Sequence, residues 1–242
     1  MGIFNELRTV LEINLEDNHL EEIEKGMFDN SPNLKRLNLA GNKLKQLPKG
    51  IFGKVMFLET IWLSENRIGQ FHRDSFKGLV YLETLLVNKN RLEELPSDIF
   101  LDLKNLKTLD LSSNQIVELH NDLFKGLQRI ESINLAGNKI TLLPVEVFDA
   151  NLLQLKSLQL SNNQIEAFSF EALSGLKSLS ELDLSNNMLS EINSITFNEI
   201  SSLNLQSNRI SFLDTNLFDN LPQLKRVRLE GNNLDSANLQ EQ

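Results

Sequence analysis

An asparagine recurs at one fixed position of a repeat that runs through almost the whole chain. The repeat reads L-x-x-L-x-L-x-x-N-x-L, and the segment from Leu34 to Leu44 shows it without a substitution. Most successive asparagines are 24 residues apart, with one step of 25 and one of 21. A short period that persists over nearly the full length predicts a stack of similar units. The ten asparagines are Asn18, Asn42, Asn66, Asn90, Asn114, Asn138, Asn163, Asn187, Asn208 and Asn232.

The middle of each unit, x-L-x-L-x, alternates polar and apolar residues and therefore predicts a short β-strand with one buried face. A unit of this size cannot bury its apolar face alone, so neighbouring units must stack, with their strands paired in a parallel sheet. The asparagine after the strand carries two donor hydrogens and an acceptor oxygen. We therefore expect a structural ladder of asparagines that bond neighbouring backbone turns, comprising Asn42, Asn66, Asn90, Asn114, Asn138, Asn163, Asn187 and Asn208.

A second column lies ten residues after each asparagine and is almost entirely phenylalanine. Its members are Phe28, Phe52, Phe76, Phe100, Phe124, Phe148, Leu173, Phe197 and Phe218. We expect these rings to stack as an aromatic spine beneath the side opposite the sheet. Proline occurs in every second of the middle repeats, at Pro48, Pro96 and Pro144. Because proline fixes φ and donates no hydrogen bond, it fits an irregular segment on that side.

The full frame, L-x-x-L-x-L-x-x-N-x-L-x-x-L-P-x-x-x-F-x-x-L, resembles the 24-residue class of the leucine-rich repeat family over about residues 4 to 239. The resemblance implies an α/β-type repeat solenoid, curved like a horseshoe. A parallel β-sheet would line its concave face, and irregular or 3-10 segments its convex face. This class is common in Toll-like receptor ectodomains, Slit-like guidance proteins, small proteoglycans and other extracellular binders. It implies protein recognition on the concave face.

Charge and hydropathy argue against two classes of partner. The formal net charge is −9 and the isoelectric point is near 5.0. An acidic chain lacks the basic stripe that nucleic acid phosphates require, so we expect no nucleic acid partner. No apolar run approaches the ~18 residues of a membrane span, so we expect no membrane insertion. Residues 1–10 also lack the basic and apolar regions of a signal peptide.

The repeat predicts a single domain over residues 1–242, with about ten repeats and without cysteine-rich caps. Extracellular members of the family usually carry disulfide-bonded caps, whereas this chain has no cysteine. Phe4, Leu7 and Val10 read as the closing half of an earlier repeat, and the last unit stops soon after Leu234. An uncapped solenoid exposes its core and a strand edge. The chain is therefore either an excised fragment or a protein whose ends a second subunit covers, as in a homodimer.

The sequence is compatible with two cellular locations, extracellular and cytoplasmic. The repeat class favours an extracellular location, either as a secreted protein or as an excised ectodomain. The absence of cysteine and of glycosylation sequons favours the alternative, a cytoplasmic location.

The chain shows no motif for catalysis, metal binding or a cofactor. No serine lies in G-x-S-x-G, and neither a phosphate-binding loop nor G-x-G-x-x-G occurs. His72 and His120 share a repeat position two units apart. With strands ~4.8 Å apart they would lie roughly 10 Å from one another, too far to share one metal. We therefore expect no enzyme activity, no metal and no cofactor.

The outward strand positions are mostly small and polar, but Trp62 and Leu86 are large and apolar on neighbouring strands. An aromatic side chain on a binding face is a frequent anchor. The alternative is a chance exposed aromatic, or one that a terminal segment covers. The predicted concave-face binding residues are Trp62, Leu86, Thr60, Thr84, Asn88, Glu65, Asp110 and Asn38.

These observations favour a non-enzymatic module that binds a protein ligand. The family resemblance links it to innate-immune or cell-surface recognition, as a receptor-like protein or a soluble decoy. Two alternatives stay open: a structural or adhesive protein that associates with itself, and an intracellular scaffold subunit. Charge is uneven, since Glu12, Glu16 and Asp17 begin an acidic first repeat while Arg226 and Arg228 lie in a basic last one. Opposite charges at the two ends would favour a head-to-tail contact.

Overall fold

A computed structural model describes residues 7–148, 152–167, 170–192, 197–213 and 216–235. Each repeat contributes one strand of three residues, and the strands follow each other at the repeat period. The bounds are β1 Glu12–Asn14, β2 Arg36–Asn38, β3 Thr60–Trp62, β4 Thr84–Leu86, β5 Thr108–Asp110, β6 Ser132–Asn134, β7 Ser157–Gln159, β8 Glu181–Asp183, β9 Ser202–Asn204 and β10 Arg226–Arg228.

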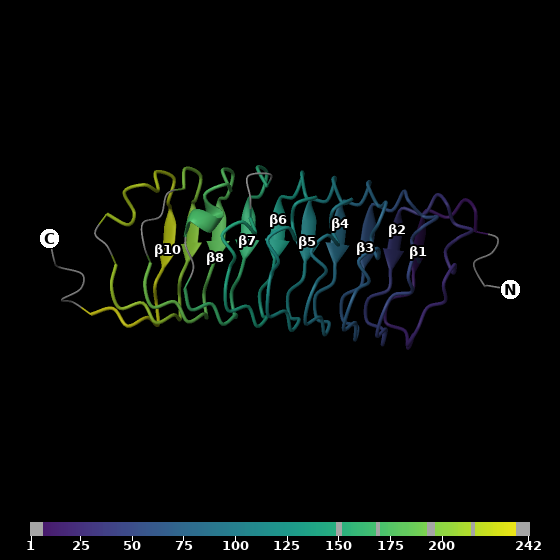
Figure 1. The fold of residues 1–242 in the computed structure, drawn as a ribbon, viewed down its shortest axis with the longest axis horizontal. Coiled ribbons are helices and arrows are strands. Elements are labelled where there is room, and N and C mark those ends of the chain that lie inside the picture. Colours follow the sequence, from purple (N-terminus) through teal and green to yellow (C-terminus); the bar gives the residue numbers. More distant parts are fainter. Residues whose placement is uncertain (1–6, 149–151, 168–169, 193–196, 214–215, 236–242) are drawn as a thin grey trace.

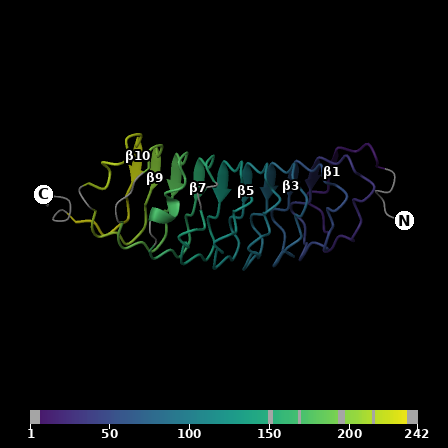
Figure 2. The same ribbon diagram turned by 45° about the horizontal axis from the view of Figure 1, so that its top comes forward.

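The ten strands form one parallel sheet in chain order, and residues at the same repeat position lie opposite one another. Figure 1 shows the strands side by side along the long axis of the molecule, and Figure 2 shows the connecting segments on the side away from the sheet. Those segments are mainly turns, and the one helix in the described part of the chain is the 3-10 helix η1, Phe170–Leu173. The predicted solenoid with a parallel sheet on one face is confirmed.

Each strand ends in a turn that requires a left-handed residue directly before the asparagine. Gly41 and Gly137 have φ of 66° and 68°, and Lys89 has φ of 56° at the same repeat position. The left-handed region costs a residue with a Cβ atom roughly 1–2 kcal/mol. The same backbone conformation recurs at Asp17, Glu65, Ser113, Asn162, Asn186, Ser207 and Gly231. The chain thus reverses in the same way in every repeat, which keeps the strands in register.

The asparagine side chains bond the backbone of two successive repeats. The Nδ2 amide of Asn66 donates to the carbonyl of Leu39 in the previous repeat at 2.9 Å and to that of Leu63 at 3.1 Å. Its Oδ1 accepts from the backbone amide of Leu44 at 3.0 Å. Bonds of the same kind occur at Asn42, Asn90, Asn114, Asn138, Asn163, Asn187 and Asn208, all of which are buried. They satisfy backbone groups for which the short strands offer no partner.

The phenylalanine column is stacked through the core opposite the sheet. Phe76, Phe100 and Phe124 are at most 1% exposed, and the ring centroids of successive members are 6.4 Å apart. Phe124 and Phe148 approach to 5.5 Å with an interplanar angle of 7°. Offset or parallel rings at such distances contribute beyond the apolar area that they bury. Of the half-repeat expected near the N-terminus, Phe4 lies outside the described residues.

Ser75, directly before Phe76 of the phenylalanine column, is a polar residue in the core. Ser75 is 2% exposed, and its hydroxyl has no hydrogen-bond partner. The other middle repeats have a larger apolar residue there, namely Ile51, Ile99, Leu123 and Val147, all buried. Ser75 also lines a surface hollow of about 260 Å³.

We expect Ser75→Val to raise the free energy of unfolding by about 1–2 kcal/mol. The change removes a buried hydroxyl without a partner and adds buried apolar surface. Urea denaturation of both proteins measures the difference. Ser112→Val, at a half-buried position on the sheet face, is the control and should give a change within about 0.5 kcal/mol. A Ser75→Val variant less stable than the wild type would show that the position cannot accept the larger side chain.

Candidate functional site

The strand register brings the predicted binding residues together on the sheet face. Asn38, Trp62, Leu86 and Asp110 lie opposite one another on β2, β3, β4 and β5 and form one row. Thr60 and Thr84 form a parallel row on β3 and β4. Two other predicted residues, Glu65 and Asn88, follow the ends of the same two strands. The eight side chains thus come from four neighbouring repeats.

Trp62 and Leu86 are half-buried rather than open to solvent on all sides. Adjacent strands are only ~4.8 Å apart, so the neighbours in a row cover the flanks of a large side chain. Side chains alternate between the two faces of a strand, and Ile61 and Leu85 point into the core. The neighbouring side chains of Trp62 and Leu86 therefore lie on the outer face of the sheet. The two form a short apolar stretch in a row whose other members nearby are polar.

Hydrogen bonds and ion pairs hold the polar residues around this apolar stretch. The hydroxyl of Ser64 donates to the Oδ1 of Asn88 at 2.5 Å, and Lys89 pairs with Glu65 at 2.7 Å. The carboxylate of Asp110 accepts from the backbone amide of Ser112 at 2.9 Å. Such bonds restrict the rotamers of the rim and reduce the entropy that binding would cost.

The sheet face and strand-end turns of β1 to β5 are acidic. Between the first strand position and the residue before each ladder asparagine, five carboxylates lie against two cations: Glu12, Glu16, Asp17, Glu65 and Asp110 against Arg36 and Lys89. The residues directly after three of those asparagines, Lys43, Arg67 and Arg91, are cationic and lie outside this count. Both cations are already paired, Arg36 with Glu12 at 2.8 Å and Lys89 with Glu65 at 2.7 Å. No ion pair within the described residues engages the three remaining carboxylates, Glu16, Asp17 and Asp110. The face therefore presents negative charge beside Trp62 and Leu86.

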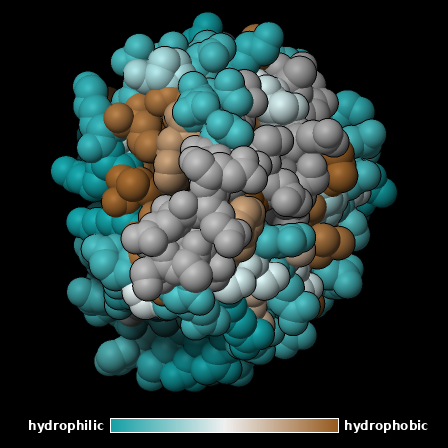
Figure 3. Space-filling view, turned by 90° about the vertical axis from the view of Figure 1, so that its left-hand side faces the viewer, coloured by the Kyte–Doolittle hydropathy of each residue, from teal (hydrophilic) through white to brown (hydrophobic). Residues whose placement is uncertain are grey.

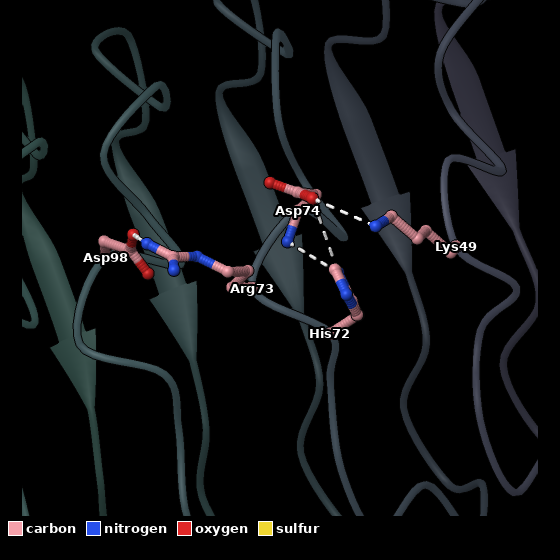
Figure 4. A network of polar contacts seen from close by, with 5 residues as sticks. All are labelled: Lys49, His72, Arg73, Asp74 and Asp98. Atoms are coloured by element: carbon pink, nitrogen blue, oxygen red, sulfur yellow. Dashed lines mark hydrogen bonds and ion pairs between the residues drawn. The ribbon is translucent and has the colours of Figure 1, made fainter.

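A charged network lies on the segments that follow β2, β3 and β4 (Figure 4). Asp74 lies 3.7 Å from the Nζ of Lys49 and 3.6 Å from the Nδ1 of His72. The backbone amide of Asp74 donates to that same Nδ1 at 3.1 Å. Arg73 forms a close ion pair with Asp98, and this contact lowers the pKa of the Asp98 carboxyl and raises that of Arg73. The network lies in open solvent, where such pairs contribute little to stability.

The described part of the chain contains no candidate metal centre, this network included. Within the described ranges, no group of three His, Asp or Glu residues is placed to hold a metal ion. His72 and His120 lie on separate repeats, two strands apart in the sheet order. None of the helices in the described ranges is long and apolar enough to cross a membrane.

The described C-terminal end of the sheet exposes apolar surface (Figure 3). Among the described strands β10 pairs with β9 alone, and its central residue Val227 is 38% exposed, whereas the equivalent Leu203 of β9 is 1% exposed. Phe212 is 56% exposed on the preceding repeat. Dimer formation through the ends of the solenoid stays a prediction, and the exposed surface around Val227 and Phe212 is where it can be tested.

The family assignment follows from a match along most of the chain. The model of the family described as leucine rich repeat matches residues 1–44, 32–92, 80–140 and 128–189. The chain belongs to the leucine-rich repeat family. Searching the curated proteins with this leucine-rich repeat chain finds no match.

Solved leucine-rich repeat structures resemble the chain closely in fold. The structure of TLR13 in complex with ssRNA13 is 28% identical with a TM-score of 0.81, over 90% of this chain and 32% of that one. Toll of Drosophila in complex with Spatzle is 28% identical with a TM-score of 0.78, over 89% and 29%. The ectodomain of the receptor kinase GASSHO1/SCHENGEN3 from Arabidopsis thaliana, in complex with CASPARIAN STRIP INTEGRITY FACTOR 2, is 28% identical with a TM-score of 0.75, over 93% and 27%. The chain spans about a third of the length of these proteins.

Two features of this leucine-rich repeat were missed by the sequence reasoning. A row of charges precedes the strands and forms pairs across repeats, with Lys35–Glu59 at 2.6 Å, Lys107–Glu83 at 2.9 Å and Lys156–Glu131 at 2.7 Å. Phe57 and Tyr81 lie next to this row with their ring centroids 5.5 Å apart. Comparing the residues nine positions before each asparagine would have identified the aromatic pair, since the other repeats have polar residues there.

Proposed function

We propose that this leucine-rich repeat protein is a non-enzymatic module that binds a protein partner on the sheet face of β2 to β5. The observation that carries the proposal is the apolar stretch of Trp62 and Leu86, surrounded by polar residues with defined bonds. A desolvated aromatic anchor within a polar rim is the usual anatomy of a protein interface.

The negative charge of the sheet face indicates which side chains the partner presents to it. Asp110 lies opposite Leu86 and has no ion pair among the described residues, which favours a partner segment that carries Lys or Arg next to an apolar residue. Glu16 and Asp17 add negative charge in the repeat before the site. The same negative field opposes the phosphates of nucleic acid. The TLR13 relative was solved with single-stranded RNA, whereas Toll and GASSHO1/SCHENGEN3 were solved with Spatzle and CASPARIAN STRIP INTEGRITY FACTOR 2. We therefore place this chain with the binders of protein rather than RNA.

We further propose that residues 1–242 act as one domain in extracellular recognition of the innate-immune or cell-surface kind. The continuous ten-stranded sheet supports the first point, and the receptor structures among the relatives support the second. A homodimer through the ends of the solenoid is compatible with this function, since the exposed Val227 end lies five strands away from β5.

The double variant Trp62→Ser with Leu86→Ser is expected to weaken partner binding by tenfold or more. Truncating two apolar anchors removes about 2 kcal/mol or more of binding energy. The partner is first captured on the intact protein, and its affinity for the wild type and the variant is then measured by calorimetry. Because both side chains are half-buried, the thermal midpoint should fall by only a few degrees.

The matched control is the double variant Gln159→Ser with Asp183→Ser. These residues occupy the same row on β7 and β8, outside the proposed site. Their replacement should leave the affinity within twofold of the wild type. If the Trp62/Leu86 variant keeps wild-type affinity while the control variant loses it, the partner binds the other half of the sheet.

A further inference from the structure

A hollow of about 500 Å³ lies at the edge of the sheet where the first strands begin. Its apolar walls are Leu11, Phe57 and Tyr81, and Lys35 and Glu59 lie on its polar side. The volume is within the range of pockets that hold small ligands or single side chains, which are mostly apolar with a few polar groups.

Phe57 and Tyr81 occupy a position that has a structural role elsewhere in the solenoid. The side chain nine residues before the ladder asparagine donates to a backbone carbonyl of the previous repeat in three cases. Asn33 donates to Arg8 at 2.9 Å, Asn105 to Val80 at 2.6 Å, and Ser178 to Leu153 at 2.7 Å. The phenyl ring of Phe57 has no donor for such a bond. The repeat therefore does not require an aromatic residue at this position.

The aromatic pair does not belong to the core either. Phe57 is 50% exposed, Tyr81 is 52% exposed and Leu11 is 49% exposed. The rings of Phe57 and Tyr81 are tilted by 35° and form one surface across two repeats. Met56 and Val80, one residue before each ring, are also exposed. Clustered exposed apolar residues of this kind usually mark an interaction site.

We propose that this hollow takes an aromatic or branched aliphatic side chain from an extended segment of the protein partner. The inference rests on the proposed function in one respect, that the same partner supplies the side chain. Lys35 and Glu59 pair with each other at 2.6 Å, so the polar side of the hollow carries no net charge. A neutral side chain suits it better than an anion or a cation.

The position of the hollow connects it with the sheet-face site. Phe57 and Tyr81 lie five residues before Trp62 and Leu86 in the same two repeats. Five extended residues span at most ~17 Å, so one partner segment of similar length can reach both apolar surfaces. The hollow then acts as a second anchor, and a partner would need two apolar residues that lie several positions apart.

The probe for a direct test is N-acetyl-L-phenylalaninamide, titrated into the intact ¹⁵N-labelled protein. We expect saturable shifts of the backbone amide signals of residues 57, 59 and 81, with a dissociation constant in the millimolar range. N-acetyl-L-alaninamide should produce none. The double variant Phe57→Ser with Tyr81→Ser should lose the saturable shifts, whereas Trp62→Ser with Leu86→Ser should keep them at these three residues.

Three results would overturn the inference. The first is the absence of saturable shifts at these residues in the wild type up to the solubility limit of the probe. The second is saturation of the same signals by methyl glucoside at equal concentration, which would make the hollow a sugar site. The third is a wild-type dimer in sedimentation that the Phe57/Tyr81 variant converts to monomer, which would assign the hollow to self-association. Because the probe is not the partner, the proposed sheet-face function can fail while this test succeeds, and the reverse also holds.

Discussion

Phe124→Ala is expected to lower the free energy of unfolding by about 3–5 kcal/mol, because it leaves a cavity in the middle of the aromatic spine. The ring is 1% exposed and lies between Phe100 at 6.4 Å and Phe148 at 5.5 Å, measured between ring centroids. In a solenoid each repeat is stabilised mainly by its contacts with its neighbours, so one missing ring weakens two interfaces. Urea denaturation measures the loss, and hydrogen exchange of the amides in β5 and β6 locates it.

The matched control for this change is Phe57→Ala. The same ring is removed, but from a side chain that is 50% exposed, so the loss should be below about 1 kcal/mol. Equal losses for the two variants would contradict the assignment of the spine to the core. A stable Phe124→Ala protein that fails to bind the partner would instead place Phe124 in a binding site.

Asn114→Ala is expected to lower the free energy of unfolding by about 1–3 kcal/mol, because it leaves buried backbone groups without partners. The Nδ2 of Asn114 donates to the carbonyls of Val87 at 3.1 Å and Leu111 at 3.0 Å. Its Oδ1 accepts from the backbone amide of Leu92 at 3.1 Å. Faster hydrogen exchange of the Leu92 amide would identify the lost bond directly.

Asn105→Ala provides the control for the ladder. Asn105 is half-buried and makes one side-chain bond, to the carbonyl of Val80, whereas Asn114 is buried and bonds two repeats, so Asn105→Ala should cost less than Asn114→Ala. An unchanged urea midpoint for Asn114→Ala would show that the asparagine does not support the turns.

The fold was predictable because the repeat imposes the same physical requirement ten times. A leucine such as Leu37 must point inward from each strand, and the only arrangement that buries it throughout is a stack of parallel strands. The sequence period therefore located every strand, including Arg226–Arg228 near the C-terminal end. The left-handed turn before each asparagine was not predicted, because residues as different as Gly41, Glu65 and Lys89 occupy it.

The candidate site was predictable only in part. The row of Trp62 and Leu86 follows from alternation along the strand, and the register places them side by side. Their degree of burial depends on how closely neighbouring side chains approach, which alternation alone does not fix. The hollow beside Phe57 and Tyr81 depends on the positions of segments outside the strands, and the repeat pattern does not specify them.

A fluorine spectrum of the single tryptophan tests the central proposal most directly. Trp62 is the only tryptophan of the chain, so protein labelled with 5-fluorotryptophan should give one ¹⁹F resonance, and Trp62→Phe should remove it. We expect this resonance to shift or broaden as unlabelled partner is added, and the change to saturate at the stoichiometry of the complex. A complex that forms fully in sedimentation while the resonance stays unchanged would contradict the proposal that Trp62 anchors the partner.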